Sequence, residues 1–221
     1  MSSAMQATEA EQRFLLRDVH WQTYQILLSE RNGGRYRITY DRGRLEFMTL
    51  SPRHERIGEL FGRFFVILSE ELNLRTVSFG SMTLQREDVD RGLEPDKCFY
   101  IQNAGSVRAD EQIDLRRDPP PDLAIEIDIT RSSLDRMGIY AALGIPEVWR
   151  FDGQNLTAFQ LGTDGEYEAQ EQSLAFPALP LAKVAEFVRQ RSIMDELTLG
   201  RSFRAWVRSD VLPHGKSAPD G

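Results

Sequence analysis

The segment 122–129, DLAIEIDI, constrains the fold more than any other part of the chain. Its apolar and polar side chains alternate, as they do on the two faces of a β-strand. One face is wholly apolar, with Leu123, Ile125, Ile127 and Ile129, and the other carries Asp122, Ala124, Glu126 and Asp128. We expect a β-strand that buries its apolar face.

The carboxylates of Glu126 and Asp128 point the same way from this predicted strand. Two like charges about 4 Å apart repel by about 4 kcal/mol at an effective dielectric constant near 20. The pair therefore indicates exposure at a strand end, a bound cation, an arginine partner or a shared proton. An edge strand with a solvated polar face is the alternative that needs no functional explanation.

A second acidic cluster, Glu94-Pro95-Asp96, begins another predicted strand at 96–101. If the two strands are neighbours, Asp96 and Glu126 converge. Two or three carboxylates with water completing the shell suit Mg²⁺ or Mn²⁺, which would activate water for phosphodiester cleavage.

The remaining patterns predict an α/β fold. Ser51-Pro52 begins a helix that carries one apolar stripe, and Asp41-Arg42-Gly43 is typical of a hairpin turn. Further expected elements are a helix at 20–30 capped by Asp18, strands at 76–79, 82–86, 147–151, 155–161 and 166–170, and helices at 132–143, 181–191 and 194–208. We expect a loose segment 1–12, one domain over 13–208 with a helical C-terminal appendage at 181–208, and a disordered tail at 209–221.

The net charge of −7 argues against a protein that coats nucleic acid through bulk charge, but it is compatible with a nucleic-acid enzyme, which needs only a local basic rim. Of the 27 basic residues, 24 are arginine, which suits phosphate recognition but does not act readily as a base. A single cysteine, Cys98, and the absence of a signal sequence or a long apolar run predict a cytoplasmic location with no membrane contact.

Several motifs together resemble a known family. Pro95-Asp96 followed thirty residues later by Glu126-Ile127-Asp128 resembles the PD-(D/E)XK nuclease signature. The wider context, with Ser51-Pro52-Arg53-His54, GLEPDKCFYI, PPDLAIEI and IYAALGIPEVWRFD, resembles the Uma-two family of restriction endonucleases over about residues 20–205.

The resemblance implies a restriction-endonuclease-like central mixed sheet flanked by helices, with an N-terminal helix and hairpin. It implies that Asp96 and Glu126 bind Mg²⁺ or Mn²⁺ and that His54 supports the site. The signature's lysine is replaced here by Asp128, and the basic residue that many relatives carry on the next helix falls on Arg136.

That replacement limits the chemistry. Arg136 stays charged, so it can stabilise a phosphate but cannot take a proton from water. Lys97 should point away from the face of Asp96 because neighbouring residues of a strand alternate. Asp128 would instead be a third carboxylate at the metal.

We therefore predict a metal-dependent endonuclease that hydrolyses DNA, with a homodimer expected where both strands are cut. The main alternative is an inactive nuclease fold that acts as a nucleic-acid-binding or assembly module. A carboxylate-rich enzyme acting on another phosphate ester is a third hypothesis.

Overall fold

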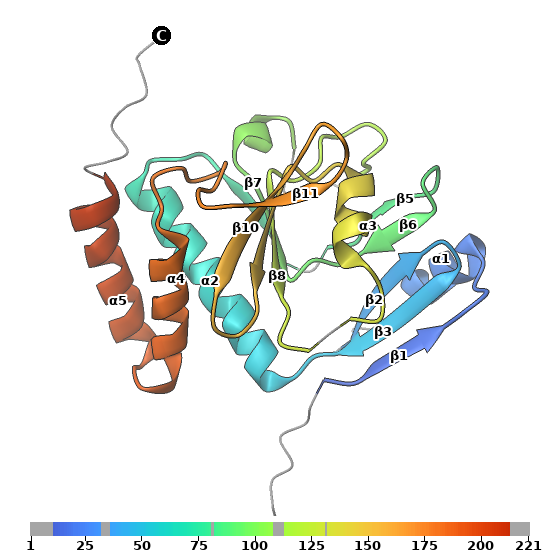
Figure 1. Cartoon of the computed structure of the whole chain (residues 1–221), viewed down its shortest axis with the longest axis horizontal. Coiled ribbons are helices and arrows are strands. Elements are labelled where there is room, and N and C mark those ends of the chain that lie inside the picture. The colour runs from blue at the N-terminus through green and yellow to red at the C-terminus, as the bar shows by residue number, and fades with distance from the viewer. Residues whose placement is uncertain (1–10, 32–35, 81, 108–112, 131, 213–221) are drawn as a thin grey trace, which may run out of the picture.

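The computed structural model describes residues 11–31, 36–80, 82–107, 113–130 and 132–212. It has a mixed α/β architecture with two sheets, and this confirms the predicted fold class (Figure 1). The larger sheet has the strand order β11 (Tyr167–Gln170), β10 (Leu156–Leu161), β9 (Glu147–Phe151), β8 (Leu123–Ile127), β7 (Lys97–Tyr100) and β4 (Val77–Phe79). The smaller sheet has the order β1 (Arg13–Leu16), β3 (Arg44–Thr49), β2 (Tyr36–Asp41), β6 (Arg91–Leu93) and β5 (Leu84–Arg86).

The strand at 122–129 forms β8, between β7 and β9 in the larger sheet. It runs antiparallel to β7 and parallel to β9. The hypothesis of a solvated edge strand is therefore wrong, because all five residues of β8 are buried. The parallel crossover from β8 to β9 passes through α3 (Arg136–Leu143).

Helix α2 (Pro52–Glu71) covers one face of the larger sheet. It begins where predicted, because Ser51 accepts a hydrogen bond from the amide of His54 and Pro52 is the first helical residue. Its predicted apolar stripe is buried against the sheet residues Ile125 and Ile127.

Helices α4 (Leu181–Arg189) and α5 (Glu196–Trp206) pack beside α2 and belong to the same hydrophobic core (Figure 1). The Phe203 ring of α5 stacks on the Phe64 ring of α2, with the ring centres 4.1 Å apart. A π-helical turn at Val207–Val211 continues α5 and buries Val207 and Val211 in that core. The C-terminal helices therefore complete the main core.

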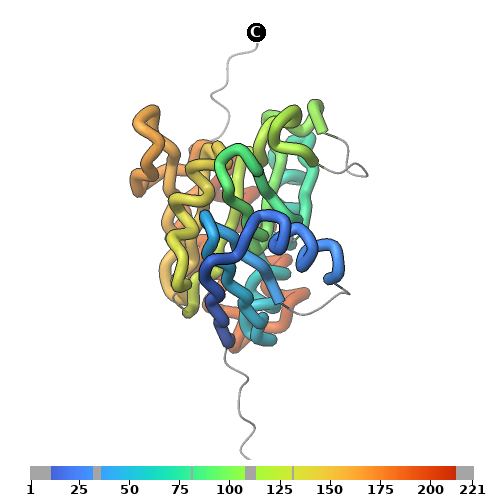
Figure 2. The backbone as a smooth tube through the Cα atoms, turned by 90° about the vertical axis from the view of Figure 1, so that its right-hand side faces the viewer, coloured from blue at the N-terminus to red at the C-terminus, as the bar shows by residue number. Residues whose placement is uncertain are grey.

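The smaller sheet and α1 (Trp21–Ser29) enclose a separate cluster of Tyr24, Ile38, Tyr40 and Leu45. This N-terminal unit and the C-terminal helices lie on opposite sides of the molecule in Figure 1, so in the view of Figure 2 the blue segments lie in front of the red ones. Helix α3 lies between the two sheets and contacts β5 and β6 (Figure 1).

The turns of two hairpins have the positive φ angles that their glycine residues favour. Arg42 and Gly43 connect β2 to β3 with φ angles of 47° and 82°, and Gly153 has a φ of 96° in the turn between β9 and β10. Positive φ angles are what such turns require, and glycine adopts them without steric cost.

Three local predictions are wrong, and two strands were not predicted. Asp18 has a φ of 54° and does not cap α1, whose preceding residue is His20. Helix α3 begins at Arg136 rather than at 132, because Asp135 accepts the capping hydrogen bond from Gly138. Strands β1 and β6 are additional. The described part of the predicted tail, 209–212, is helical rather than disordered, because Val211 is buried in the main core. The expected glycine end of the first helix and the rest of the tail lie outside the described residues.

Candidate active site

The pairing of β7 with β8 brings the two acidic motifs together. Lys97 pairs with Ile125, so the register places Asp96 opposite Glu126. The amide of Asp96 donates to the carbonyl of Ile125 at 3.2 Å. The two motifs therefore lie on neighbouring strands, which is the condition for Asp96 and Glu126 to converge, and both carboxylates are buried.

Asp96 is surrounded by donors. Its carboxylate accepts hydrogen bonds from His54 Nε2 at 2.6 Å, from the Ile127 amide at 2.6 Å and from Arg37. Burial by itself would raise the pKa of Asp96, but Arg37, His54 and the Ile127 amide hold it below its usual range. The Asp96 carboxylate is therefore ionised, and its oxygens accept hydrogen bonds from other groups of the protein.

His54 connects Asp96 to the N-terminal segment. Its Nδ1 lies 2.7 Å from Glu11 Oε1, while its Nε2 faces Asp96. Burial lowers the pKa of His54, yet the two carboxylates raise it to about 9. At neutral pH both ring nitrogens therefore carry protons, and His54 acts as a buried cation that positions Asp96.

Glu126 is bound by α3. Arg136 donates from Nε to Glu126 Oε2 at 2.9 Å and from Nη2 to Oε1 at 2.6 Å. Tyr140, one helical turn later, also donates to Oε1. The Asp135 cap fixes the start of α3, so Arg136 and Tyr140 both reach Glu126.

Arg136 also ties α3 to the smaller sheet. Its guanidinium donates to the Thr39 hydroxyl and, at 2.9 Å, to the Glu94 carbonyl. Burial lowers the pKa of Arg136, but Glu126 raises it above its usual value, so the group keeps its charge. The arginine partner anticipated for the acidic face of β8 is therefore present.

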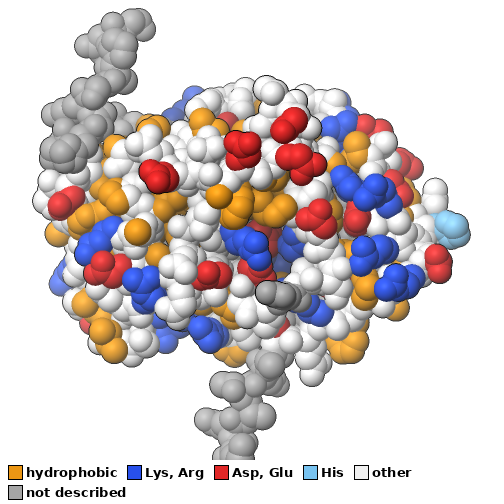
Figure 3. All heavy atoms as spheres, in the orientation of Figure 1, with side chains coloured by type: hydrophobic (Ala, Val, Ile, Leu, Met, Phe, Trp, Pro, Cys, Tyr) orange, Lys and Arg blue, Asp and Glu red, His pale blue; other side chains and the backbone are white. Residues whose placement is uncertain are grey.

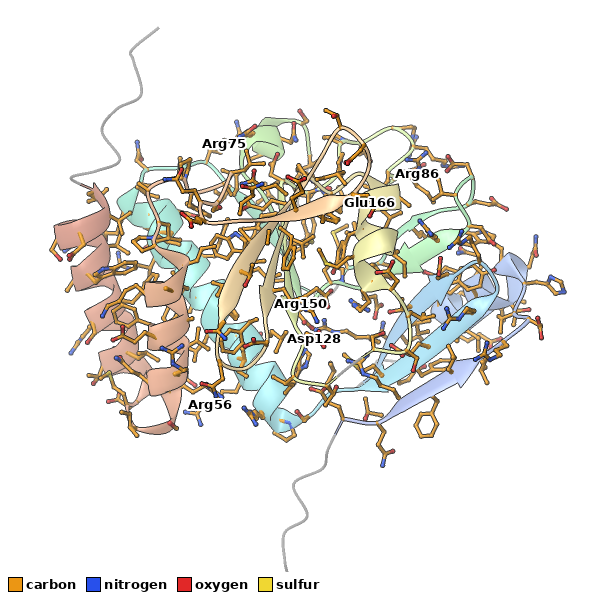
Figure 4. All side chains as sticks on the ribbon, in the orientation of Figure 1. Arg56, Arg75, Arg86, Asp128, Arg150 and Glu166 are labelled. Carbon is orange, nitrogen blue, oxygen red and sulfur yellow. The ribbon has the colours of Figure 1, made fainter. Side chains whose placement is uncertain are left out.

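Asp128 and Lys97 lie apart from this pair. Asp128, at the end of β8, accepts a hydrogen bond from Arg150 Nε at 2.9 Å (Figure 4). Lys97 Nζ contacts Glu59 Oε1 of α2 at 2.7 Å, on the opposite face of the sheet as predicted. Within the described ranges, no three histidine, cysteine, aspartate or glutamate side chains form a metal-binding group, so Asp128 does not join Asp96 and Glu126 in one.

A pocket of about 310 Å³ opens beside these residues. Its lining includes Glu126, Asp128, Arg136 and Arg150, whereas Asp96 and His54 lie outside the lining. Figure 4 shows Asp128 and Arg150 pointing toward one another near the middle of this face, and Figure 3 shows a basic and acidic group at the same place. Of the two paired carboxylates, only Glu126 therefore lines the pocket.

Residues 21–192 match the family Uma2, described as "Putative restriction endonuclease". The chain belongs to the Uma2 family. The resemblance noted from the motifs is thereby confirmed.

Among solved structures, this Uma2 protein is similar to one described as the "Crystal structure of a putative nuclease belonging to DUF820 from Anabaena variabilis". The identity is 14%, the match covers 76% of this chain and 90% of the other, and the TM-score is 0.44. No curated protein matches the chain. No helix in the described part of the chain is long and apolar enough to cross a membrane.

The donor set of this Uma2 protein fits a divalent ion in its chemistry. Asp96 and Glu126 offer hard carboxylate oxygens from adjacent strands, which is the ligand type that Mg²⁺ and Mn²⁺ prefer. Glu126 already has a cation against it, the guanidinium of Arg136. A metal ion at Glu126 would take the place that part of this guanidinium now occupies.

Three contributors to the Uma2 site were not predicted. Glu11 falls in a segment expected to be loose, Arg37 lies in an ordinary strand, and Glu46 holds the segment that leads to α3. Glu46 is buried and accepts hydrogen bonds from Arg13, Ser132 and the Ser133 amide at 2.8–2.9 Å. The sequence held one signal for these buried contacts. Polar residues occur within β2 and β3, at Arg37, Thr39 and Glu46.

Proposed function

We propose that this protein is a metal-dependent endonuclease that hydrolyses phosphodiester bonds in DNA. The observation that carries the proposal is the placement of Asp96 opposite Glu126 on the central strands of a Uma2 protein, with Glu126 lining a pocket. Asp96 and Glu126 would hold Mg²⁺ or Mn²⁺. When bound, the ion activates water and neutralises charge that develops on the phosphate.

The side chains around this pair have separate tasks. Arg136 stays charged, so it stabilises the non-bridging phosphate oxygens once its contact with Glu126 loosens. His54 positions Asp96 through its 2.6 Å contact. Asp128 and Arg150 lie on the rim of the pocket, where Arg150 can contact phosphate and Asp128 orients it.

One observation favours a second function, an inactive nuclease fold that binds nucleic acid. Arg136 stands where the resemblance places the basic residue of the signature, and it engages both oxygens of Glu126. A bidentate arginine contact is stronger and more directional than a lysine contact. In an inactive protein of this kind, the Arg136 guanidinium stays bound to Glu126 and occupies the position that a metal ion would need.

The two functions differ in one measurement. Purified protein is incubated with supercoiled plasmid and Mg²⁺ or Mn²⁺, and nicked and linear products are counted. The hydrolytic function predicts cleavage that EDTA abolishes and that Asp96→Asn and Glu126→Gln each reduce by at least about a hundredfold. The control is Glu59→Gln, which removes an exposed carboxylate from the opposite face of the sheet.

Calorimetric titration with Mn²⁺ completes the test. Binding that is lost in Glu126→Gln but retained in Glu59→Gln supports the metal site. Wild-type protein that binds DNA but neither takes up Mn²⁺ nor cleaves would establish the inactive module.

Two copies of the chain would supply one active site for each strand of a duplex, so we include a homodimer in the proposal. Light scattering of the purified protein measures this directly. A species at twice 25.3 kDa supports the dimer, and a single 25.3 kDa species contradicts it.

A further inference from the structure

Arginines gather around the turn that joins β9 to β10, on the side of the molecule that carries the pocket. A β-carbon added to Gly153 in this turn would lie 3.7 Å from Nη2 of Arg53. Arg189 donates to the carbonyl of Gln154 in the same turn. Arg191 lies two residues after Arg189, and Arg56 lies 3.7 Å from Glu196, five residues beyond Arg191, so the start of α2 lies beside this segment.

The cluster comes from elements that are distant in the sequence. Arg53 and Arg56 lie in the first two turns of α2, while Arg189 and Arg191 lie at the end of α4 and in the turn that follows. Packing of α4 beside α2 therefore brings the positive charges together.

Few carboxylates compensate these charges. Among the described residues, Arg53, Arg189 and Arg191 form no ion pair within 4.0 Å, and Arg191 donates only to the carbonyl of Val188 at 2.9 Å. Arg56 lies 3.7 Å from Glu196, and both side chains are more than half exposed. An exposed pair of this kind contributes little.

The position of Arg53 and Arg56 at the start of α2 makes their positive charges less favourable. The N-terminal end of a helix carries a positive partial charge, so acidic residues are favoured there and arginines are not. Glu55 is the acidic residue in the first turn of α2, and it forms no ion pair with its arginine neighbours among the described residues. Burial lowers the pKa of the partly buried Arg191, and the charges of Arg53 and Arg56 lower it further.

The arginine cluster continues the charged rim of the pocket. Arg150 lines the pocket and precedes Gly153 by three residues, which is a distance of about 10 Å at ~3.3 Å per residue. In Figure 4 Arg56 lies below Arg150 in the view, toward the N-terminal end of α2. In Figure 3 basic side chains lie at the middle and over the lower part of this face, with some acidic ones among them.

We propose that Arg53, Arg56 and Arg191 bind the phosphodiester backbone of a nucleic-acid duplex that enters the pocket beside them. This inference rests on the proposed function, and it names the surface that holds the substrate outside the pocket. Uncompensated arginines beside a helix N-terminus are a favourable site for phosphate. They also explain how a chain with a net charge of −7 can bind a polyanion.

The test measures binding without cleavage. Fluorescence anisotropy of a labelled DNA duplex, and of an RNA duplex of the same sequence, is recorded in EDTA at several salt concentrations. We expect Arg53→Glu to weaken duplex binding by at least about threefold and Arg53→Glu/Arg191→Glu by about tenfold or more. The dependence of log K on log salt should become shallower by about one for each phosphate that the variant no longer neutralises.

The matched control is Arg75→Glu. Arg75 is also exposed, but it follows the opposite end of α2, about 30 Å away for a helix of 20 residues (Figure 4). Equal losses in Arg75→Glu and Arg53→Glu, or no loss in either, would overturn the inference. Arg53→Gln, which keeps a long polar side chain at an exposed position, replaces Arg53→Glu if charge reversal lowers the melting temperature.

Cleavage assays separate this inference from the proposed function. Duplex binding that depends on Arg53 in a wild-type protein that never cleaves would support the arginine surface and refute the hydrolytic function. Cleavage by the wild-type protein, together with unchanged duplex affinity in Arg53→Glu/Arg191→Glu, would support the hydrolytic function and refute the arginine surface. The RNA arm shows whether the surface distinguishes the two duplex geometries.

Discussion

Arg136 and Glu126 form a two-point ion pair between α3 and the central strand β8, with N–O distances of 2.9 Å and 2.6 Å. The pair is mostly buried, with side-chain exposures of 12% and 10%. It therefore links the position of α3 to the carboxylate predicted to bind metal.

Removing only one member of this pair should be costly. Arg136→Met leaves Glu126 as a buried charge without its main partner, and breaking such a pair costs about 3 kcal/mol or more. Arg136→Met/Glu126→Gln should recover most of that loss because no charge is left unpaired. Urea denaturation of the two single variants and the double variant measures the coupling energy, and simple additivity would contradict this description.

Arg136→Lys should increase metal affinity. A lysine ammonium is a point charge that cannot engage both Glu126 oxygens in a fork, so one oxygen becomes available. We expect Mn²⁺ to bind about tenfold more tightly in calorimetric titration, with faster plasmid nicking. Arg150→Lys is the matched control, because Arg150 contacts Asp128 on the pocket rim. Tighter binding in both variants, or in neither, would argue against competition at Glu126.

The stability of the fold should fall at alkaline pH. The pKa of His54 is raised from about 6.5 to about 9, so its stabilising contribution is complete below pH 6.5 and is lost as the pH rises through 9. The upper limit of this contribution is about 3 kcal/mol. Denaturation between pH 6 and pH 9.5 measures the slope, and His54→Gln should flatten it. The same slope in wild type and His54→Gln would assign the effect to other groups. His20→Gln, at an exposed position, is the control.

Glu46 should control the order of the segment before α3. Glu46→Gln replaces an acceptor of three hydrogen bonds with a group that presents an amide NH₂ to the same donors. We expect a loss of about 1–3 kcal/mol in stability. Hydrogen exchange at the Ser133 amide should also become faster. Glu55→Gln at an exposed site of α2 should change neither, and unchanged exchange in Glu46→Gln would show that the segment is held by other contacts.

Much of the fold could be predicted because its signals are local. The alternation in β8, the Ser51-Pro52 start of α2 and the glycine turns each depend on a few adjacent residues. Strands β1 and β6 could not be predicted in the same way. Each has only three or four residues, and each is defined by pairing with β3 or β2. The start of α3 was misplaced because three candidates within four residues, Ser132, Ser133 and Asp135, can all cap a helix.

The acidic residues of the site could be predicted from the sequence, but the residues that contact them could not. Asp96 and Glu126 stand in motifs that the sequence displays, and the structure adds the strand pairing that brings them together. Glu11 and Arg37 reach the site only through tertiary contacts across 43 and 59 residues. No local pattern encodes such contacts, so the network that holds Asp96 became visible only in three dimensions.

The stacking of Phe203 on Phe64 has a practical consequence. The family match ends at residue 192, whereas α5 and the turn after it extend the shared core to Val211. A truncation designed from the family boundary would strip a whole helix from α2 and leave its aromatic side chains facing water. Expression of this protein in pieces should therefore keep the chain through at least residue 212.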